Sequence, residues 1–214
     1  PFTSVQMRLF SLSRSLDLDE VQKEDLEVIS AEIRHIDTIV QNFLEFSRPP
    51  KLKIQDGSPS SVVDAALRLL QYRLKSYEVT VTVNRPIPLP GTRIDIEQLK
   101  EVVVNLIINA CEAMPPGGSI TIEERAEINP YLGPAAVIVV RDNGPGIPSH
   151  LREKIFQPFF TTKEQGTGLG LSIAQRIITE LGGRLELEST ASRGATFIIT
   201  LPCQEPAHEH DSDH

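Results

Sequence analysis

The sequence predicts an α+β protein, in which a helical hairpin precedes a larger domain of helices and strands. Two patterns and a break lead to this fold class. Apolar residues in the first 50 positions recur at alternating spacings of three and four, which is typical of helices packed on helices. Helical stripes further along the chain are interspersed with short alternating apolar and polar runs, which favour an at least partly antiparallel sheet. Pro49-Pro50 ends the second helix and separates the two parts.

The hairpin is predicted over residues 1–50. An aspartate in the segment Asp17-Leu-Asp-Glu20 can cap the second helix, and acidic residues suit the positive end of that helix. Ile39, Leu44 and Phe46 widen the apolar stripe of the second helix, as expected in a bundle and not in a two-stranded coil. The stripes of the two helices are otherwise spaced by three and four. They consist of Val5, Leu9, Leu12 and Leu16 in the first helix, and of Leu26, Ile29, Ile33, Ile36, Val40 and Phe43 in the second.

The rest of the chain divides into a linker over 51–59, a globular domain over 60–203 and a disordered tail over 204–214. The domain's elements follow from periodicity and from proline and glycine breaks. We expect helices at 60–75, 95–113 and 169–181, and strands at 79–83, 119–125, 135–141, 184–188 and 195–201.

Composition limits the classes of function. The net charge of −8 argues against nucleic acid as a partner, because phosphate-binding surfaces need excess Lys and Arg. The two cysteines fit a reduced cytoplasmic compartment, and no apolar run is long enough to span a membrane. Because the sequence begins at Pro1, we expect a fragment. The chain would then be cytoplasmic, or the cytoplasmic part of a parent anchored in the membrane by missing upstream segments.

The first of four chemical blocks lies on the helix at 95–113. Glu101, Asn105 and Asn109 are spaced by four, which aligns them in one row on an otherwise apolar helix. Buried polar side chains need partners, and a hydrated cation with phosphate oxygens would provide them. An ordinary solvated stripe explains the row equally well.

The second block, Asp142-Asn-Gly-Pro-Gly-Ile147, follows a strand. Asp142 can accept a hydrogen bond from a ligand amine, and Gly144 and Gly146 allow close approach of the backbone. A simple turn is the alternative.

The third block, Phe156-Gln-Pro-Phe-Phe160-Thr161-Thr-Lys163, suits a flap whose lysine could reach a phosphate, or else a core aromatic cluster. The fourth block, Gly166-Thr167-Gly168-Leu169-Gly170, leads into a helix, so its amides could bind an anion. It ends without the Gly-Lys-Ser/Thr of a P-loop, and no βαβ unit surrounds it.

The four blocks in this order resemble the N, G1, F and G2 boxes of sensor histidine kinases of two-component systems, whose ATP-binding fold is shared with gyrase, Hsp90 and MutL. Asn-Ala-Cys-Glu-Ala-Met and Phe-Phe-Thr-Thr-Lys are most similar to the nitrogen-regulation type. The resemblance spans residues 95–202. It implies an α/β sandwich with a mixed sheet, the cofactors ATP and Mg²⁺, and a dimer in which two hairpins form a four-helix bundle.

The resemblance also implies roles for single residues. Asn105 would be the Mg²⁺ ligand, Asn109 would contact phosphates or ribose, and Asp142 would bind the adenine amine. Lys163 would act on the phosphates as a catalytic residue. The remaining candidate nucleotide-binding residues are Gly144, Gly146, Ile147, Phe160, Thr161, Gly166, Thr167, Gly168, Leu169, Gly170 and Thr196. Similar proteins that hydrolyse ATP carry a glutamate at the position of Glu101, which makes this residue a second catalytic candidate.

In this family the accepting histidine is followed five residues later by a proline, and Pro1-Phe2-Thr3 resembles the continuation from that proline. We therefore expect the acceptor upstream of Pro1, with a response-regulator receiver domain as the partner that takes the phosphoryl group. His35 lies on the second helix and is interpreted as a structural or surface residue. An ATPase or a protein serine kinase on the same fold is the alternative enzyme, and a pseudokinase or dimerisation module is the alternative without catalysis.

Overall fold

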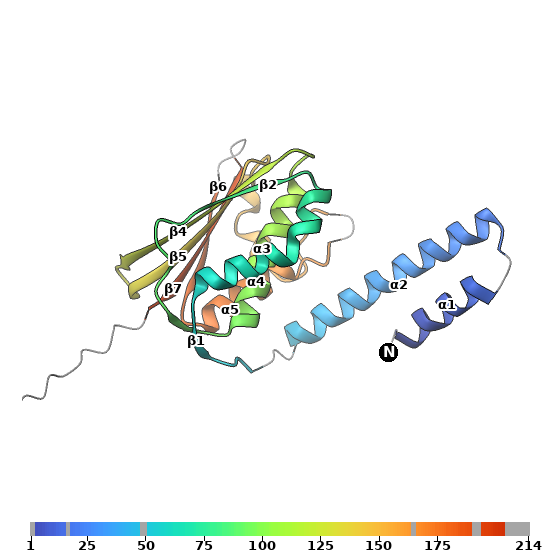
Figure 1. Cartoon of the computed structure of the whole chain (residues 1–214), viewed down its shortest axis with the longest axis horizontal. Coiled ribbons are helices and arrows are strands. Elements are labelled where there is room, and N and C mark those ends of the chain that lie inside the picture. Colours follow the sequence, from blue (N-terminus) through green and yellow to red (C-terminus); the bar gives the residue numbers. More distant parts are fainter. Residues whose placement is uncertain (1–2, 16–17, 48–50, 164–165, 190–193, 204–214) are drawn as a thin grey trace, which may run out of the picture.

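The computed structural model describes residues 3–15, 18–47, 51–163, 166–189 and 194–203, which form a helical hairpin and an α/β domain (Figure 1). The tail predicted over 204–214 lies outside the described residues, as do Leu16 and the side chain of His35. Within the described part of the chain, no helix is both long and apolar enough to cross a membrane.

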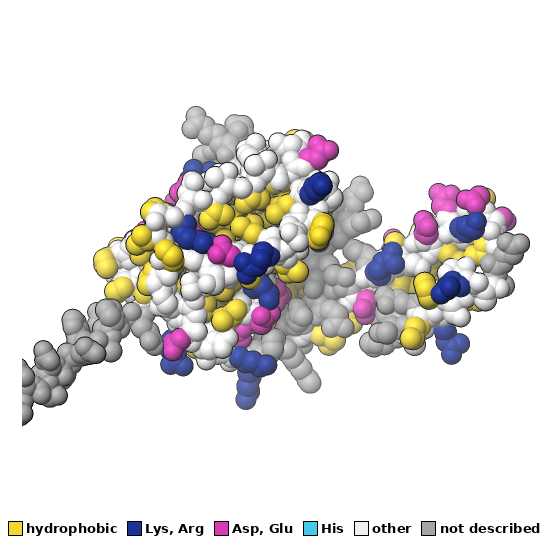
Figure 2. All heavy atoms as spheres, viewed as in Figure 1, with side chains coloured by type: hydrophobic (Ala, Val, Ile, Leu, Met, Phe, Trp, Pro, Cys, Tyr) yellow, Lys and Arg dark blue, Asp and Glu magenta, His cyan; other side chains and the backbone are white. Residues whose placement is uncertain are grey.

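The hairpin consists of α1 (Thr3–Ser15) and α2 (Glu20–Ser47), as predicted. Asp19 caps α2, because its Oδ1 accepts the N–H of Gln22 at 2.8 Å while Gln22 Oε1 accepts the N–H of Asp19 at 3.2 Å. Many apolar side chains of both helices reach the surface between charged ones (Figure 2).

The sheet of the α/β domain has five strands in the order β2-β4-β5-β7-β6. The pair β2 and β4 is parallel and the other pairs are antiparallel, so the sheet is mixed, as the fold class requires. The strands are β2 (Thr80–Asn84), β4 (Ser119–Asn129), β5 (Gly133–Asp142), β6 (Arg184–Ser189) and β7 (Ala195–Pro202).

Three helices cover one face of this sheet: α3 (Pro59–Ser76), α4 (Ile96–Ala113) and α5 (Gly170–Glu180) (Figure 1). Their apolar faces and the facing strand residues form one continuous core. Asp95 caps α4, since its Oδ1 accepts the N–H of Gln98 at 3.1 Å. Between β5 and α5 the chain has two 3₁₀ turns, η1 (Ser149–Leu151) and η2 (Lys154–Phe156).

The segment 51–59, which the sequence predicts as a linker, is not irregular throughout. It contains β1 (Gln55–Gly57), which pairs antiparallel with β3 (Thr92–Ile94) in a separate two-stranded sheet. A Cβ atom at Gly57 would lie 3.2 Å from Ile94, so the strand packs closely on the core of the domain. This pairing assigns β1 to the α/β domain.

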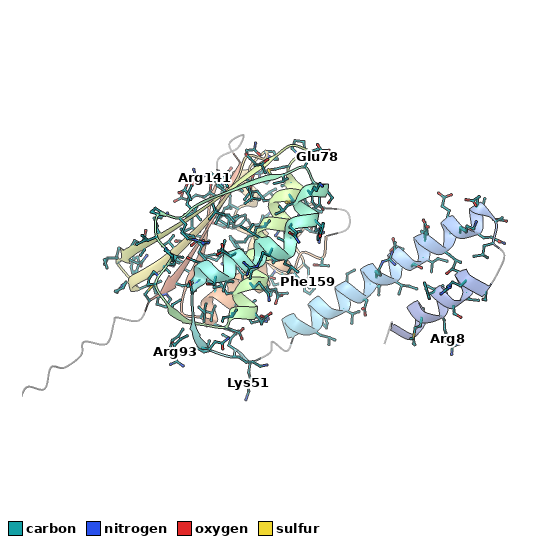
Figure 3. All side chains as sticks on the ribbon, in the orientation of Figure 1. Arg8, Lys51, Glu78, Arg93, Arg141 and Phe159 are labelled. Carbon is teal, nitrogen blue, oxygen red and sulfur yellow. The ribbon has the colours of Figure 1, made fainter. Side chains whose placement is uncertain are left out.

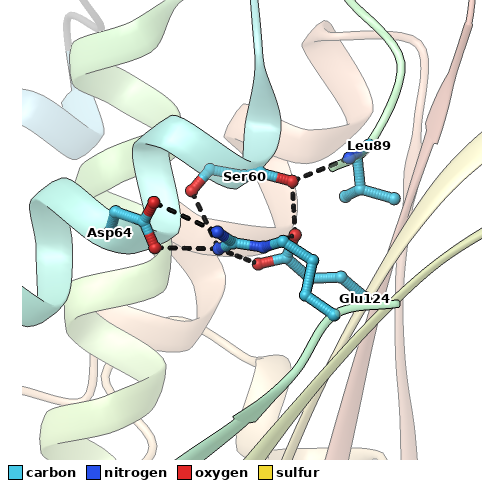
Figure 4. Close-up of polar contacts among 5 residues, drawn as sticks. Ser60, Asp64, Leu89 and Glu124 are labelled. Carbon is cyan, nitrogen blue, oxygen red and sulfur yellow. Dashed lines mark hydrogen bonds and ion pairs between the residues drawn. The ribbon is translucent and has the colours of Figure 1, made fainter. Parts of the chain in front are cut away.

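A partly buried polar network ties α3 to β4 and to the loop after β2 (Figure 4). Arg85 Nη2 lies 2.7 Å from Glu124 Oε1 and 2.8 Å from Asp64 Oδ1. The Ser60 hydroxyl donates to Glu124 and accepts the N–H of Leu89 at 2.8 Å. The hydrogen bond from Arg85 lowers the pKa of Asp64, and the Glu124 carboxylate is compensated although its side chain is fully buried.

Candidate nucleotide-binding site

A cavity of about 610 Å³ lies at the end of β5, between α4 and the segment that leads into α5. It brings together most of the residues that the four sequence blocks predict, although these blocks are far apart in the chain. The predicted residues that line it are Asn105, Asn109, Asp142, Gly146, Ile147, Phe160, Thr161, Lys163, Gly166, Thr167, Gly168 and Gly170.

The polar row on α4 forms one wall of the cavity. Asn105 and Asn109 are half-buried, and Asn109 Nδ2 donates to Asn105 Oδ1 at 3.0 Å. A Cβ atom at Gly170 would lie 2.7 Å from both amide atoms of Asn105, so the first residue of α5 packs closely against this side chain. The backbone at the start of α5 therefore lies next to the amide of Asn105.

Asp142, which ends β5, is 7% exposed and is held by the backbone. Its Oδ1 accepts the N–H of Gly144 at 2.8 Å and that of Ala195 at 3.1 Å. Gly194 has a φ of 77°, and a Cβ atom there would lie 1.9 Å from the Asp142 carbonyl oxygen. The ends of β5 and β7 thus fix the carboxylate at the cavity wall.

The segment before the glycine-rich loop has an unusual backbone. Phe159 has a φ of 67°, in the left-handed region, and its backbone packs against Gly168, where a Cβ atom would lie 2.4 Å from the Phe159 carbonyl carbon. The Phe159 ring is exposed, and its centroid lies 6.5 Å from that of Phe43 on α2. Figure 3 shows Phe159 on the side of the domain that faces the hairpin.

Lys163 points across the cavity to α4. Its Nζ donates to Asn109 Oδ1 at 3.0 Å and to Glu112 Oε2 at 2.6 Å. Glu112 also lies 3.7 Å from Arg73 on α3. The sequence prediction missed Glu112. Its place three residues after Asn109, on the same face of α4, was the available signal.

The structure does not place Thr196 in the cavity, which corrects the prediction for this residue. Thr196 Oγ1 accepts a hydrogen bond from Arg141 Nε at 3.3 Å, and Arg141 lies on the sheet face away from the helices (Figure 3). The neighbours Ala195 and Phe197 line the cavity instead. Successive strand side chains point to opposite faces, so an assignment that is one residue off moves the side chain to the other side of the sheet.

Three more predicted residues are not among those that line the cavity. Leu169 is fully buried in the core. Gly144 packs against Met114 and donates its N–H to the carboxylate of Asp142. Glu101 is exposed, and its Oε2 accepts a hydrogen bond from Gln98 Nε2 at 3.4 Å. The row predicted on α4 therefore reaches the cavity at Asn105 and Asn109 but not at Glu101.

The arrangement suits a ligand with a flat apolar part and an anionic part. Ile147, Phe160 and Phe197 provide apolar surface near the carboxylate of Asp142, which can orient a donor amine. The ammonium group of Lys163 and the N-terminus of α5 provide positive charge at the anionic part. The amide oxygen of Asn105 is a ligand type that Mg²⁺ accepts together with phosphate oxygens.

Comparison with known families identifies the class to which the protein belongs. Residues 94–205 match the family of histidine kinase-, DNA gyrase B- and HSP90-like ATPases, and residues 1–51 match the His Kinase A (phospho-acceptor) domain. The first match covers more than half of the chain, and the chain therefore belongs to this ATPase family.

Among curated proteins, the chain is similar to two bacterial kinases. It is 36% identical over 202 residues to the signal transduction histidine-protein kinase AtoS of Escherichia coli (strain K12). The matched region covers 94% of this chain and 32% of AtoS. It is 39% identical over 177 residues to the sensor kinase CckA of Brucella abortus (strain 2308), and this match covers 77% of the chain and 19% of CckA. The chain thus spans a third or less of the length of either relative.

Solved structures are also similar. The nucleotide-free catalytic domain of histidine kinase ThkA has a TM-score of 0.62 and 32% identity, covering 71% of this chain and 96% of that chain. Histidine kinase ThkA in complex with the response regulator protein TrrA has a TM-score of 0.72 and 29% identity, covering 95% and 58%. Full-length ShkA in complex with AMPPNP shares the fold, with a TM-score of 0.75 at 22% identity.

Proposed function

We propose that the chain is the catalytic core of a sensor histidine kinase, which binds Mg-ATP, phosphorylates a histidine and supplies the phosphoryl group to an aspartate of a response regulator. The observation that carries this proposal is that Lys163, hydrogen-bonded to Asn109, and the buried Asp142 line the same cavity. The similarity to AtoS over nearly the whole chain favours a histidine kinase over an ATPase or a serine kinase on this fold.

Recognition of the base depends on Asp142. Two backbone N–H groups engage its Oδ1, which fixes the carboxylate so that it can accept a hydrogen bond from the exocyclic amine of adenine. Gly146 and Ile147 form the adjacent wall, where the purine ring would find close backbone approach and apolar contact. A carboxylate that accepts from an amine favours adenine over guanine, whose corresponding group is a carbonyl.

The phosphates would lie between α4 and the start of α5. Asn105 would hold Mg²⁺, which supplies charge neutralisation and orients the phosphate oxygens. Lys163, the amides from Gly166 to Gly170 and the helix N-terminus would orient the γ-phosphoryl group for transfer in line with the attacking imidazole nitrogen. Phosphoryl transfer needs such positioning and charge stabilisation more than covalent chemistry from the protein.

The hairpin supplies the partner-binding part of the proposal. Its match to the phospho-acceptor domain favours a homodimer in which two hairpins form a four-helix bundle. The complex of ThkA with TrrA supports a response-regulator receiver domain as the second partner. The ring of Phe43 on α2 lies 6.5 Å from that of Phe159, whose backbone packs against Gly168, so the hairpin approaches the glycine-rich loop.

The test is calorimetric titration of the full chain with a non-hydrolysable ATP analogue, with and without Mg²⁺. Asp142→Asn should weaken binding by about 10- to 100-fold, because an amide can present a donor to the adenine amine and leaves the buried site imperfectly paired. Asp56→Asn, an exposed aspartate on β1, is the matched control and should bind like the wild type. Unchanged affinity in the Asp142 variant would contradict the assignment of the adenine site.

A further inference from the structure

We propose that Glu112 is a positioning residue for phosphoryl transfer: it holds the ammonium group of Lys163 over Asn109, so that the flap presents its positive charge to the phosphates of the nucleotide. This inference rests on the proposed function, because it names a further residue of the same site. In this proposal Glu112 acts through Lys163 and does not contact the nucleotide.

The contacts place Glu112, which lines the cavity, at the centre of a small charged cluster. Its Oε2 lies 2.6 Å from Lys163 Nζ, and its Oε1 lies 3.7 Å from an Nη2 atom of Arg73. Lys163 comes from the flap and Arg73 from α3, so two cations approach the carboxylate from different elements. Arg73 therefore helps to orient the carboxylate that receives Lys163.

The position of Glu112 in α4 argues against a role in helix stability. Glu112 lies in the last turn of α4, which ends at Ala113 and has no basic residue in that turn. The negative end of the helix dipole disfavours a carboxylate there. A residue that breaks a local rule and is compensated from distant elements is typical of a functional site.

Lys163 has enough N–H donors to bind Glu112 and a phosphate of the nucleotide at the same time. A lysine ammonium group has three N–H donors, and Lys163 directs two of them to Asn109 and Glu112. A phosphate oxygen can therefore accept from the third donor while both of these bonds persist. Glu112 thus orders the flexible lysine stem before the nucleotide binds, and this lowers the entropy cost of engaging the phosphates.

The first experiment compares Glu112→Gln with the wild type by calorimetry, using two probes in the presence of Mg²⁺. We expect the affinity for a non-hydrolysable ATP analogue to fall about three- to fivefold, in keeping with a partly exposed ion pair. The affinity for adenosine, which lacks phosphates, should not change. Glu97→Gln is the matched control, because Glu97 also forms an ion pair on α4, with Lys100 at 2.5 Å, but is not part of the cavity.

The second experiment repeats the Glu112→Gln titration in a Lys163→Met background, where a residue that acts through Lys163 should have no further effect on the affinity for the ATP analogue. Three results would overturn the inference alone: unchanged or tighter binding in Glu112→Gln, an equal loss for adenosine, or the same loss without Lys163. If the wild type binds no ATP analogue, the proposed function fails and this inference fails with it. The thermal midpoints of the variants check that each one is folded.

Discussion

The hairpin and the α/β domain bury their apolar side chains to very different extents. In the hairpin, Ile29 is 46% exposed and Phe43 is 50% exposed, although both belong to the apolar stripe of α2. In the domain, Ile94 and Leu106 have no exposed surface. The domain therefore completes its own core, whereas the hairpin has apolar surface that a second molecule would have to cover.

The largest effect is expected when the apolar stripe of the hairpin is broken. Ile29 and Ile36 are seven residues apart on α2 and both are exposed, so they lie on one face. The double variant Ile29→Glu/Ile36→Glu should be monomeric under conditions in which the wild type is a dimer, because burying two carboxylates costs more than the contacts contribute. Light scattering coupled to size exclusion measures the change.

The control for this variant is Leu69→Glu. Leu69 is an exposed leucine on α3 of the α/β domain, and the dimer should persist when it is replaced. A monomeric wild type would contradict the proposed bundle, and the loss of the dimer in Leu69→Glu would place the interface on the α/β domain instead.

A smaller effect, confined to the α/β domain, is expected from Arg85→Met. The variant leaves the fully buried Glu124 carboxylate without its ion-pair partner, which should lower the free energy of unfolding by about 3 kcal/mol. Urea unfolding followed by circular dichroism measures this change, and the oligomeric state should not change. The exposed Arg93, replaced in the same way, should alter the stability by less than about 0.5 kcal/mol.

The same variant should also change the pH dependence of stability. Because the hydrogen bond from Arg85 lowers the pKa of folded Asp64 below its ordinary value of 3.8, this contribution is present above that value and is lost as the pH falls below it. The stability of Arg85→Met should therefore fall less steeply with acid than that of the wild type. An identical acid dependence in both proteins would show that Asp64 gains nothing from Arg85.

Local patterns were sufficient to predict the parts of the fold that local physics determines. The apolar stripe and an aspartate cap in the segment 17–20 predicted α2, and the structure places that cap at Asp19. The helix predicted over 95–113, which is followed by prolines and glycines at 115–118, corresponds to α4. Asn105, Asn109, Asp142 and the glycine-rich loop were found because their residue types and spacing resemble a family pattern, and the cavity brings them together.

What the sequence could not predict depends on tertiary contacts. The strands β1 and β3 have three residues each, too few to show an alternating pattern, and they are stabilised by pairing with each other. The role inferred for Glu112 depends on its contact with Lys163, which is 51 residues away in the sequence and is brought close only by the fold. The Thr196 assignment failed because the motif alone does not reveal which face of β7 a side chain occupies.

The smallest effect tests whether the α/β domain can carry out chemistry on its own. Glu101 does not line the cavity, but it lies one helical turn before Asn105, and the hypothesis is that its carboxylate activates water for slow ATP hydrolysis. Because Glu101 is exposed, Glu101→Gln should reduce phosphate release by only about 100-fold, the lower end of the range for a general base, and should leave the affinity for the ATP analogue unchanged. Glu97→Gln, one turn earlier on α4, should hydrolyse ATP like the wild type. Equal losses of affinity and of hydrolysis in Glu101→Gln would make Glu101 a residue that positions the nucleotide, and the general-base assignment would be wrong.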